Sequence, residues 1–361
     1  MKSTLILTAL WLIGAASKEM RMRSRPKSES NELNNMCDLK ASDGKNIRCF
    51  CVQERYPVST AECWIFGPIV DEHFMWRLIV SSQPFLTEFN LMTSNQTRFI
   101  PSHFFEHMLF LKNFSVSLAL LERLEKFAFG NSTSLESLKL AKNQIEHLDQ
   151  FSLSQLTRLK HLDLQKNRIR TIKRFVFFNT TELKYIRLNS NNIIKVEDKA
   201  FESMGNVLEM DLSDNYLCDI NNLTFFGLSK LKVIDLSANR IIKLESSVFS
   251  EMWDVEELYL EDNHIEFISN RAFDGLRFLK TLSLGNNRLS RIPSGLLTSV
   301  FTLVNLDVSN NRLETLVFDS IEQFYNNLLR NGTIQLKAAI DPRNLTNSNP
   351  PLAKPTISNP K

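Results

Sequence analysis

The sequence predicts an α/β-type solenoid, a coil of short repeats that bends into a horseshoe with a concave parallel β-sheet. Three observations predict it. A pattern L-x-x-L-x-L-x-x-N-x-L recurs eight times from Leu135 to Leu313, with an unbroken period of 24 residues. Each copy carries an asparagine at the same position, and a column of large apolar residues follows each asparagine ten residues later. Self-similarity at a fixed period of this length is typical of stacked repeats.

Each repeat is predicted to contribute one short strand. The alternation around L-x-L directs two apolar side chains inward and the residues between them outward. One such strand cannot bury its apolar side alone, so successive turns are expected to pair their strands in parallel. The asparagine follows the strand, where its amide can donate to and accept from the main chain of adjacent turns. These ladder asparagines are Asn143, Asn167, Asn191, Asn215, Asn239, Asn263, Asn287 and Asn311.

Two apolar columns complete the 24-residue frame. The column five residues after the asparagine runs from Leu148 to Leu316, and the column ten residues after it runs from Leu153 to Ile321. The second column contains much of the unusual content of 26 Phe, whose rings can stack in the outer half of the core. Paired strands are about 4.8 Å apart, and the bulkier segments opposite need more room. The stack is therefore expected to bend with its sheet on the inner side.

The same frame continues upstream in a weaker form. One step back places Ala119 in the asparagine position, and a second step places Asn95 there, with Thr87 and Asn90 where leucines are expected. The repeats are therefore expected to number about ten and to occupy 77–324.

The N-terminus predicts export. Residues 1–17 contain one Lys, an apolar run from Leu5 to Ile13 and then small residues, which is the composition of a secretory signal peptide and too short a run to span a bilayer. Residues 18–36 are polar and basic, as in a disordered linker. From Cys37 onward acidic and basic residues balance, so the sequence predicts no nucleic-acid partner.

Four cysteines precede the repeats. Cys37, Cys49, Cys51 and Cys63 form C-x11-C-x-C-x11-C within 37–76. In an exported chain they are expected to form disulfides in a small cap over the otherwise open first repeat, with three pairings possible. A zinc site is the alternative use of these thiols. A fifth cysteine, Cys218, is expected to be free or to form an intermolecular bridge.

The repeat pattern and the four-cysteine segment together resemble the extracellular leucine-rich repeat proteins. In that family the first cysteine of the cap pairs with the third and the second with the fourth, which implies Cys37 with Cys51 and Cys49 with Cys63. Within the family, CDLKASDGKNIRCFCVQERYPVSTAECWIF, followed by WRLIV, is similar to the connectin family of insect cell-surface adhesion proteins. This resemblance implies homophilic adhesion by a protein that a lipid anchor holds at the membrane.

The C-terminal segment departs from that family. Residues 325–361 are rich in Asn and Pro and are predicted to be a disordered tail, without the cysteine-rich cap or hydrophobic terminus that the resemblance implies. One explanation is that the last apolar residues close the stack, and the favoured one is that the sequence belongs to a longer anchored protein. A membrane would then be reached through a lipid anchor or a partner that this sequence does not encode.

The chain also contains seven acceptor signals for N-linked glycosylation, in agreement with an extracellular or cell-surface location. A glycan at Asn113 would lie on the inner face, whereas Asn131 and Asn179 fall on the return segment behind the sheet. The seven asparagines are Asn95, Asn113, Asn131, Asn179, Asn222, Asn331 and Asn344.

The outward strand positions of the inner face are the predicted binding surface, because repeat proteins present this broad sheet to partners. The early repeats are basic there, with Asp163 as an exception, and the middle repeats are acidic, so one copy could attract another. The alternative is that the grouping reflects chance on a solvent-exposed surface. The predicted partner-binding residues are Lys139, Lys142, Lys166, Tyr185, Arg187, Glu209, Asp211, Asp235, Glu257 and Tyr259.

The sequence does not favour an enzyme. His103–His107 has the H-x-x-E-H spacing of some zinc proteases, but Phe105 lies in the aromatic column of the repeats. No nucleophile elbow, phosphate loop or dinucleotide fingerprint is present, and no cofactor is predicted. Two functions remain: adhesion through self-binding, and recognition of a separate ligand by a secreted or receptor-like module similar to Toll-type ectodomains.

Overall fold

The computed structural model describes part of the chain. The described residues are 35–38, 47–52, 59–67, 74–93, 98, 100, 102–130, 132–313, 326 and 335–337. The predicted signal peptide and nearly all of the predicted linker and tail lie outside these residues.

Short strands dominate the described residues. The helices are η1 (Met36–Asp38), α2 (Phe74–Ser82) and α3 (Ser102–His107). The strands are β1 (Ile47–Val52), β2 (Thr60–Ile65), β3 (Glu88–Thr93), β4 (Asn113–Ser117), β5 (Arg123–Leu124), β6 (Ser137–Lys139), β7 (His147–Leu148), β8 (His161–Asp163), β9 (Thr171–Ile172), β10 (Tyr185–Arg187), β11 (Lys195–Val196), β12 (Glu209–Asp211), β13 (Val233–Asp235), β14 (Lys243–Leu244), β15 (Glu257–Tyr259), β16 (Phe267–Ile268), β17 (Thr281–Ser283), β18 (Asn305–Asp307) and β19 (Gln335–Lys337).

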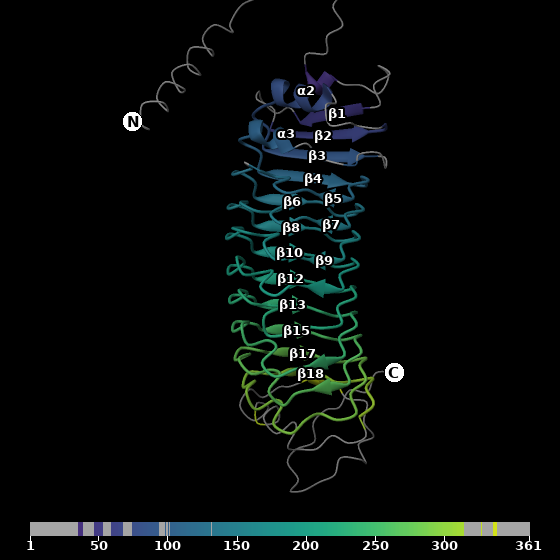
Figure 1. Ribbon diagram of the computed structural model, residues 1–361, viewed down its shortest axis with the longest axis vertical. Helices are drawn as coiled ribbons and strands as arrows, with labels where there is room; N and C mark the ends of the chain where they lie inside the picture. Colours follow the sequence, from purple (N-terminus) through teal and green to yellow (C-terminus); the bar gives the residue numbers. More distant parts are fainter. Residues whose placement is uncertain are drawn as a thin grey trace, which may run out of the picture. The chain divides into compact units, whose positions relative to one another are not determined.

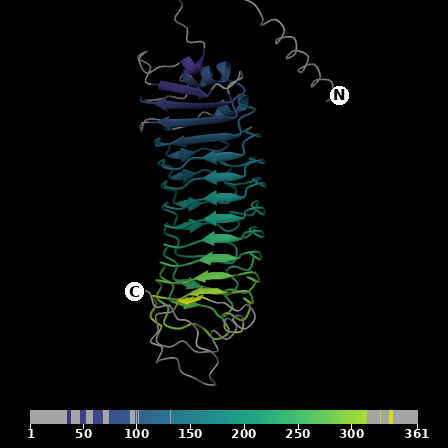
Figure 2. The same cartoon turned by 180° about the vertical axis from the view of Figure 1, so that it is seen from behind.

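One sheet runs through the whole stack. It has 13 strands in the order β1-β2-β3-β4-β6-β8-β10-β12-β13-β15-β17-β18-β19, drawn as a single row in Figure 1 and from behind in Figure 2. Neighbouring strands are parallel, except that β1 and β2 are antiparallel. Tyr185 pairs with His161 on one side and with Glu209 on the other, so the 24-residue period of the sequence is the register of the sheet. The predicted solenoid is confirmed.

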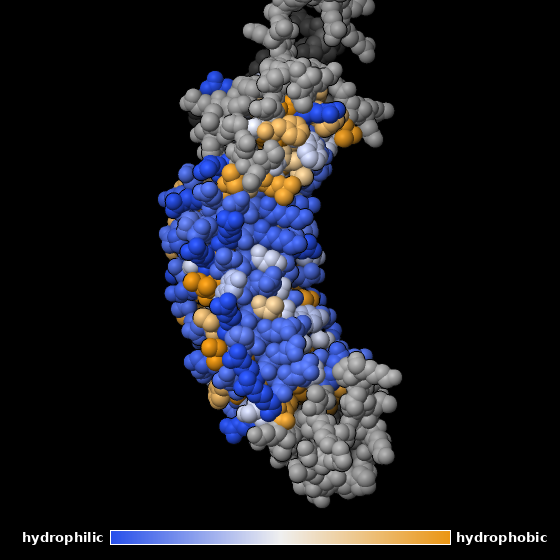
Figure 3. Space-filling view, turned by 90° about the vertical axis from the view of Figure 1, so that its right-hand side faces the viewer, coloured by the Kyte–Doolittle hydropathy of each residue, from blue (hydrophilic) through white to orange (hydrophobic). Residues whose placement is uncertain are grey.

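The core follows the predicted columns. In the repeats, the middle residue of each three-residue strand is buried and its two neighbours face outward, as in β8 and β12. Phe rings stack on the opposite side of the core, for example Phe249 and Phe273, whose ring centroids are 6.0 Å apart. Three small parallel pairs, β5–β7, β9–β11 and β14–β16, form where the column five residues after the asparagine turns inward. Figure 3 shows the stack bent in side view, with a largely hydrophilic flank.

The ladder asparagines join successive turns, and all of them are buried except Asn311, which is half-buried. The amide nitrogen of Asn215 donates to the carbonyl of Leu212 at 3.1 Å in its own turn and to that of Leu188 at 3.0 Å in the preceding turn. Its amide oxygen accepts from the backbone N–H of Ile193 at 3.0 Å. The other seven ladder asparagines likewise donate within their own turn and bond in both directions with the preceding one. Each amide therefore satisfies backbone groups that the coil would otherwise bury without partners.

The residue before each ladder asparagine has a left-handed backbone. Its φ is 58° at Lys142 and 52° at Asp214, and it stays positive through every repeat up to Asn310. Its N–H donates across to the next turn, as Asp214 does to the carbonyl of Ser237 at 3.0 Å. Sequence reasoning did not predict this conformation, because Lys, Ser, Ala, Asp and Asn all occupy the position.

The predicted frame is wrong by one residue at the first repeat. Glu88 pairs with Asn113, a step of 25 residues, and the strand buries Phe89 and Leu91 where the 24-residue frame had placed Asn90 among the apolar positions. At Phe105 the 24-residue period holds again, because its ring lies 5.0 Å from that of Phe129, the equivalent residue of the next repeat. The extra residue therefore lies between β3 and Phe105.

The predicted ladder position of Asn95 lies outside the described residues, in the segment between β3 and Phe105 that contains the extra residue. The described ladder therefore ends at Asn143, which bonds to the backbone of Val116 and Ala119.

The disulfide-bonded segment extends the sheet at its N-terminal edge. The structure contains Cys37–Cys51 and Cys49–Cys63, the pairing that the resemblance implies. The hairpin β1–β2 joins the sheet through parallel pairing of β2 with β3. Helix α2 contacts η1 and α3, with Trp76 and Ile79 buried, so the boundary predicted at residue 76 falls inside a helix.

At the other end the sheet continues beyond its predicted limit. Gln335–Lys337 form β19 and pair with β18, so the predicted disordered tail over 325–361 is wrong at these three residues. The step from Asn305 to Gln335 is 30 residues, so the 24-residue frame could not locate this strand. Within the described ranges, no helix is long and apolar enough to cross a membrane.

Candidate interaction surface

We define the inner face as the outward side chains of β4 to β19 together with the turn residues that follow each strand. Two shallow hollows lie on it. The larger, of about 790 Å³, crosses β4 to β15, and the smaller, of about 460 Å³, crosses β15 to β19. Seven of the ten predicted partner-binding residues line the larger hollow, namely Lys139, Tyr185, Arg187, Glu209, Asp211, Asp235 and Tyr259.

The other three predicted residues lie beside this hollow. Lys142 and Lys166 occupy the left-handed turn position, with φ of 58° and 55°, and both are exposed. Glu257 is half-buried on β15, where the hydroxyl of Tyr259 donates to its carboxylate at 2.6 Å. This bond, and then burial, raises the pKa of Tyr259 to about 12, so the phenol stays protonated at neutral pH.

A stacked pair of rings lies in the larger hollow. His161 and Tyr185 on β8 and β10 stack with centroids 4.9 Å apart and planes 4° from parallel. Burial and then the charges of Lys139, Lys160 and Lys184 lower the pKa of His161, which favours a neutral imidazole. Sequence reasoning missed His161, although it occupies the same strand position as Tyr185 one repeat earlier.

Positive charge collects on the early strands of the face. Lys139, Lys142, Lys166 and Arg187 lie on or beside β6, β8 and β10, with Asp163 as the exception among them. The exposed cations at Lys139 and Arg187 flank Asp163 on neighbouring strands.

Negative charge collects on the next three strands. Among the described residues, none of these carboxylates forms an ion pair. The side-chain oxygen Oε2 of Glu261 is shielded from solvent and, within that same part of the chain, accepts no hydrogen bond. The seven carboxylates are those of Glu209, Asp211, Asp214, Asp235, Glu257, Glu261 and Asp262.

Asp211 has a raised pKa, and burial is the main cause. Burial raises its pKa, hydrogen bonds from the Ser213 hydroxyl and backbone lower it, and the charge of Asp235 on the neighbouring strand raises it further, with a net upward shift. Asp211 and Asp235 each accept the backbone N–H two residues ahead, at 3.0 Å and 2.8 Å, so they also close the turn after their strands.

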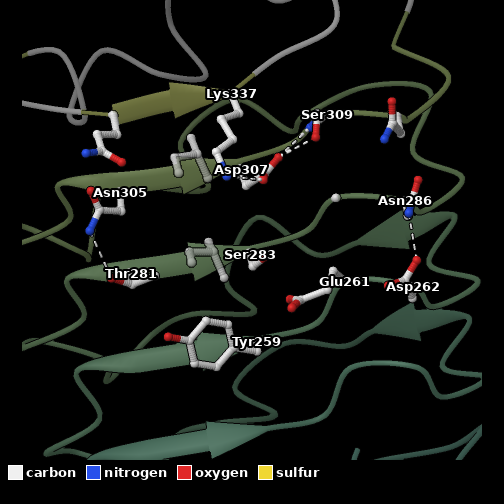
Figure 4. Close-up of a pocket in the computed structure, with 15 residues that line it drawn as sticks. Tyr259, Glu261, Asp262, Thr281, Ser283, Asn286, Asn305, Asp307, Ser309 and Lys337 are labelled. Carbon is white, nitrogen blue, oxygen red and sulfur yellow. Dashed lines mark hydrogen bonds and ion pairs between the residues drawn. The ribbon is translucent and has the colours of Figure 1, made fainter. Parts of the chain in front are cut away.

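The smaller hollow is polar and has one ion pair of its own (Figure 4). Lys337 of β19 lies 3.4 Å from the carboxylate of Asp307, and the amide of Asn305 donates to the Thr281 hydroxyl at 3.1 Å. Gly285 lines this hollow at the position that Glu261 occupies in the preceding repeat. Sequence reasoning did not include these residues, although extending the strand register by two repeats beyond Tyr259 finds Thr281 to Asp307.

Three predicted glycosylation sites lie within the described residues. Asn113 is exposed and lines one end of the larger hollow, so a glycan there would restrict the face beside β4. Asn222 is exposed, and Asn179 is half-buried behind the sheet, with φ of 59°. Four predicted sites fall outside the described residues, namely Asn95, Asn131, Asn331 and Asn344.

Among the described residues, neither Cys218 nor the H-x-x-E-H segment belongs to a cluster that could bind a metal ion. Cys218 is an exposed free thiol. The described residues contain no cluster of three or more His, Cys, Asp or Glu that could hold a metal ion. In α3, Phe104 and Phe105 of the H-x-x-E-H segment are buried, and the side chain of His103 lies outside the described residues.

Family models match most of the repeat stack. The model described as "Leucine rich repeat" matches 181–241 and 229–289, and a second model of that description matches 302–324. The model described as "BspA type Leucine rich repeat region (6 copies)" matches 83–208. The chain is a leucine-rich repeat protein. This fold is generally used as a scaffold for protein interaction, and the comparisons give no indication of catalysis. No curated protein matches the chain.

Solved structures share the fold. A chain of the Toll–Spatzle complex of Drosophila is 21% identical with a TM-score of 0.63, over 76% of this chain and 36% of that one. A chain of the TLR13–ssRNA13 complex is 20% identical with a TM-score of 0.61, over 75% and 41%. An internalin of Listeria monocytogenes is 18% identical with a TM-score of 0.52, over 77% and 80%. The leucine-rich repeat chain thus spans less than half of the Toll and TLR13 neighbours.

Proposed function

We propose that this leucine-rich repeat protein is an extracellular recognition protein that binds protein partners, including a second copy of itself, through the inner face. The observation that carries the proposal is the separation of charge. Four cations lie on or just after the early strands, and seven carboxylates, which form no ion pair within the described residues, lie on or just after β12, β13 and β15. Like charges on neighbouring strands repel each other, so this arrangement does not serve the stability of the sheet. A partner that brings the opposite charge would relieve it.

A second copy can supply that charge. If two inner faces meet in opposite directions, the cations of one copy lie over the carboxylates of the other. Complementary potentials raise the rate of association and exclude partners of the wrong sign. His161 and Tyr185 lie within the basic zone and Tyr259 within the acidic zone, and all three provide ring surface for the contact. This geometry favours homophilic adhesion of the kind that the connectin-like N-terminal segment implies.

Two features support an extracellular or cell-surface location. Cys37–Cys51 and Cys49–Cys63 are disulfides, which persist in oxidising compartments. The predicted leader and the seven glycosylation signals agree with export.

Capture of a separate ligand is the second candidate. The Toll–Spatzle and TLR13–ssRNA13 structures are complexes in which a similar repeat chain holds a partner. The acidic zone would then favour a ligand protein with a basic surface.

Charge reversal at Glu209 and Asp214 tests the proposal. Both are exposed, and Lys already occupies the turn position of Asp214 at Lys142, so Lys is compatible with that backbone. Asp211 and Asp235 are less suitable because their carboxylates close the turns. Beads coated with the Glu209→Lys/Asp214→Lys protein are expected to aggregate at least about tenfold less than wild-type beads, because a loss of roughly 1.4 kcal/mol reduces binding tenfold. Raised salt should also weaken wild-type aggregation.

A matched control reverses Glu125 and Glu182, two exposed carboxylates outside the inner face. This control changes the net charge by the same amount and should aggregate like the wild type. A charge swap then identifies the contact: Glu209→Lys/Asp214→Lys beads should bind Lys142→Glu/Lys166→Glu beads, although neither binds itself. Failure of the swap, with loss of self-binding in both reversed proteins, would exclude the pairing of the two charged zones, whereas wild-type beads that do not aggregate would favour capture of a separate ligand. Unchanged aggregation in both reversed proteins would show that the inner face does not mediate self-binding.

A further inference from the structure

Four phenylalanines form an aromatic strip behind the sheet. Phe127, Phe151 and Phe175 occupy the same position in three successive turns, and Phe178 lies beside the last two. The ring centroids of Phe127 and Phe151 are 6.0 Å apart, and Phe151 and Phe175 stack at 5.6 Å with planes 2° from parallel. Phe178 meets both of the latter rings edge-on, at 5.8 Å and 6.2 Å.

The strip is not part of the core. Phe127 is 47% exposed and Phe178 is 40% exposed, whereas the Phe column of the core is buried. The backbone at Phe127, Phe151 and Phe175 is left-handed, with φ of 59°, 64° and 67°, which is unusual for a bulky residue. Bonds between turns hold it there, such as the N–H of Phe151 donating to the carbonyl of Phe175 at 3.0 Å. The rings are therefore fixed in a row and leave apolar surface in contact with water.

A glycosylation signal adjoins this strip. Asn179 follows Phe178 directly and begins the sequence N-T-T. Its amide nitrogen donates to the side-chain oxygen of Gln155 at 2.8 Å, and the backbone of Gln155 donates to the carbonyl of Phe178 at 2.8 Å. Thr181, which completes the signal, is exposed. Two repeat periods earlier in the sequence, Asn131 begins the signal N-S-T four residues after Phe127.

We propose that Asn179 carries an N-linked glycan whose first N-acetylglucosamine packs on Phe178 and covers this end of the strip. The inference rests on the extracellular location in the proposed function. The amide nitrogen of Asn179 forms a bond to C1 of the sugar of a lipid-pyrophosphate-linked oligosaccharide. The bond from C1 to the pyrophosphate oxygen breaks, the amide proton is released, and the lipid pyrophosphate leaves. The remaining amide hydrogen can keep the bond to Gln155.

The chemistry of the strip favours a sugar over a protein partner. One face of an N-acetylglucosamine ring presents C–H groups, which pack on aromatic rings. The strip is limited to a few rings and flanked by cations, with Lys126 over Phe127 at 4.9 Å and Arg174 over Phe175 at 4.6 Å. Lys199 takes the place of Phe in the next turn. A specific protein interface needs about 800 Å² on each partner, which four partly buried rings do not supply.

The experiment uses the full chain secreted from a eukaryotic cell line with its own leader. Glycopeptide mass spectrometry is expected to find Asn179 occupied. Thr181→Ala removes the signal while leaving Asn179 and its bond to Gln155 in place. It is expected to lower Tm by about 2 °C or more and to increase binding of an apolar dye. Asn222→Gln, which removes a glycan from an exposed site away from the strip, should change neither.

The dependence on Phe178 separates stacking from a general effect of glycosylation. In the Phe178→Ala background, Thr181→Ala should lower Tm by less than half as much as in the wild type. Equal losses in both backgrounds, or no loss in either, would overturn the packing of the sugar on the strip. An unmodified Asn179 in a protein that is glycosylated elsewhere would overturn the inference alone, whereas a chain with no glycan at any site would also contradict the extracellular location. Thr181→Ala should leave bead aggregation unchanged.

Discussion

Two columns of charge run along the same sheet and are built in opposite ways. In the column just before the strands, which we call the flank column, each Glu is paired with Lys of an adjacent turn: Glu136 lies 2.7 Å from Lys160, and Glu256 lies 3.2 Å from Lys232 and 2.6 Å from Lys280. On the inner face, carboxylates follow one another on β12, β13 and β15 and form no ion pair within the described residues.

The pKa values of the two regions move in opposite directions. The hydrogen bond and charge of Lys160 lower the pKa of Glu136, and Lys280 and Lys232 lower that of Glu256. Burial, with the charge of Asp235 adding to it, raises the pKa of Asp211. The Glu side chains of the flank column are therefore paired with Lys within the chain itself, whereas the carboxylates of the inner face remain available to the cations of a partner. In a repeat stack, exposed charges should therefore be compared between equivalent positions of successive repeats. Positions only one or two residues apart differ in whether their charges pair within the chain or are available to a partner.

Loss of a ladder asparagine is expected to lower stability more than any change of charge in either region. Asn215→Ala removes an amide that satisfies the backbone of two turns. The free energy of unfolding should fall by about 1 to 3 kcal/mol, since buried backbone groups lose their partners. Urea unfolding measures it. Asn192→Ala, at an exposed asparagine in the preceding turn, is the matched control and should be neutral. Equal stability of the two variants would contradict the role of the row.

Charge reversal in the flank column should lower stability without changing aggregation, whereas charge reversal on the inner face should lower aggregation. Glu256→Lys places three lysines in a row and should lower Tm by less than Asn215→Ala does, because the column is solvent-exposed and screened. Bead aggregation should remain at the wild-type level. Glu256→Gln, which removes the attraction without adding repulsion, should lower Tm less. Lost aggregation in a folded Glu256→Lys protein would extend the interaction surface to the flank.

The smallest effect is the pH dependence of the two carboxyl groups. The raised pKa of Asp211 means that its contribution to stability is present below the usual carboxyl range and is lost as pH rises through its folded value. The lowered pKa of Glu256 means that its contribution is present above that range and is lost as pH falls. Asp211→Asn should therefore be more stable than the wild type at pH 7, with a difference that shrinks towards about pH 4.

Glu256→Gln should behave oppositely, being less stable than the wild type at pH 7 and approaching it in acid. Urea midpoints between about pH 4 and pH 8 measure both variants. Asparagine at 211 keeps an oxygen that can accept the Ser213 N–H, so the comparison isolates the charge. Differences that do not vary with pH would contradict the opposite pKa shifts.

Much of the fold followed from the sequence because the repeat is local. A fixed period in the chain becomes a fixed register between strands, so Leu162 or Asn167 could be assigned to the core from spacing alone. The same register placed Lys139, Arg187, Glu209 and Asp235 together on one face. The prediction failed where the period changes: the extra residue before Phe105 and the 30-residue step to β19 both lie in connecting segments, which carry no leucine pattern.

The sequence by itself determined that this chain coils, which residues its turns bury, and which sign of charge each strand presents, because each of these depends on residues within one 24-residue unit. Only the tertiary structure decided which charges are compensated, where the left-handed turns lie, that His161 and Tyr185 stack, and that Phe127, Phe151, Phe175 and Phe178 form an exposed strip. These features arise from contacts between successive turns, and such contacts depend on distances and angles that the spacing of residues along the chain does not contain.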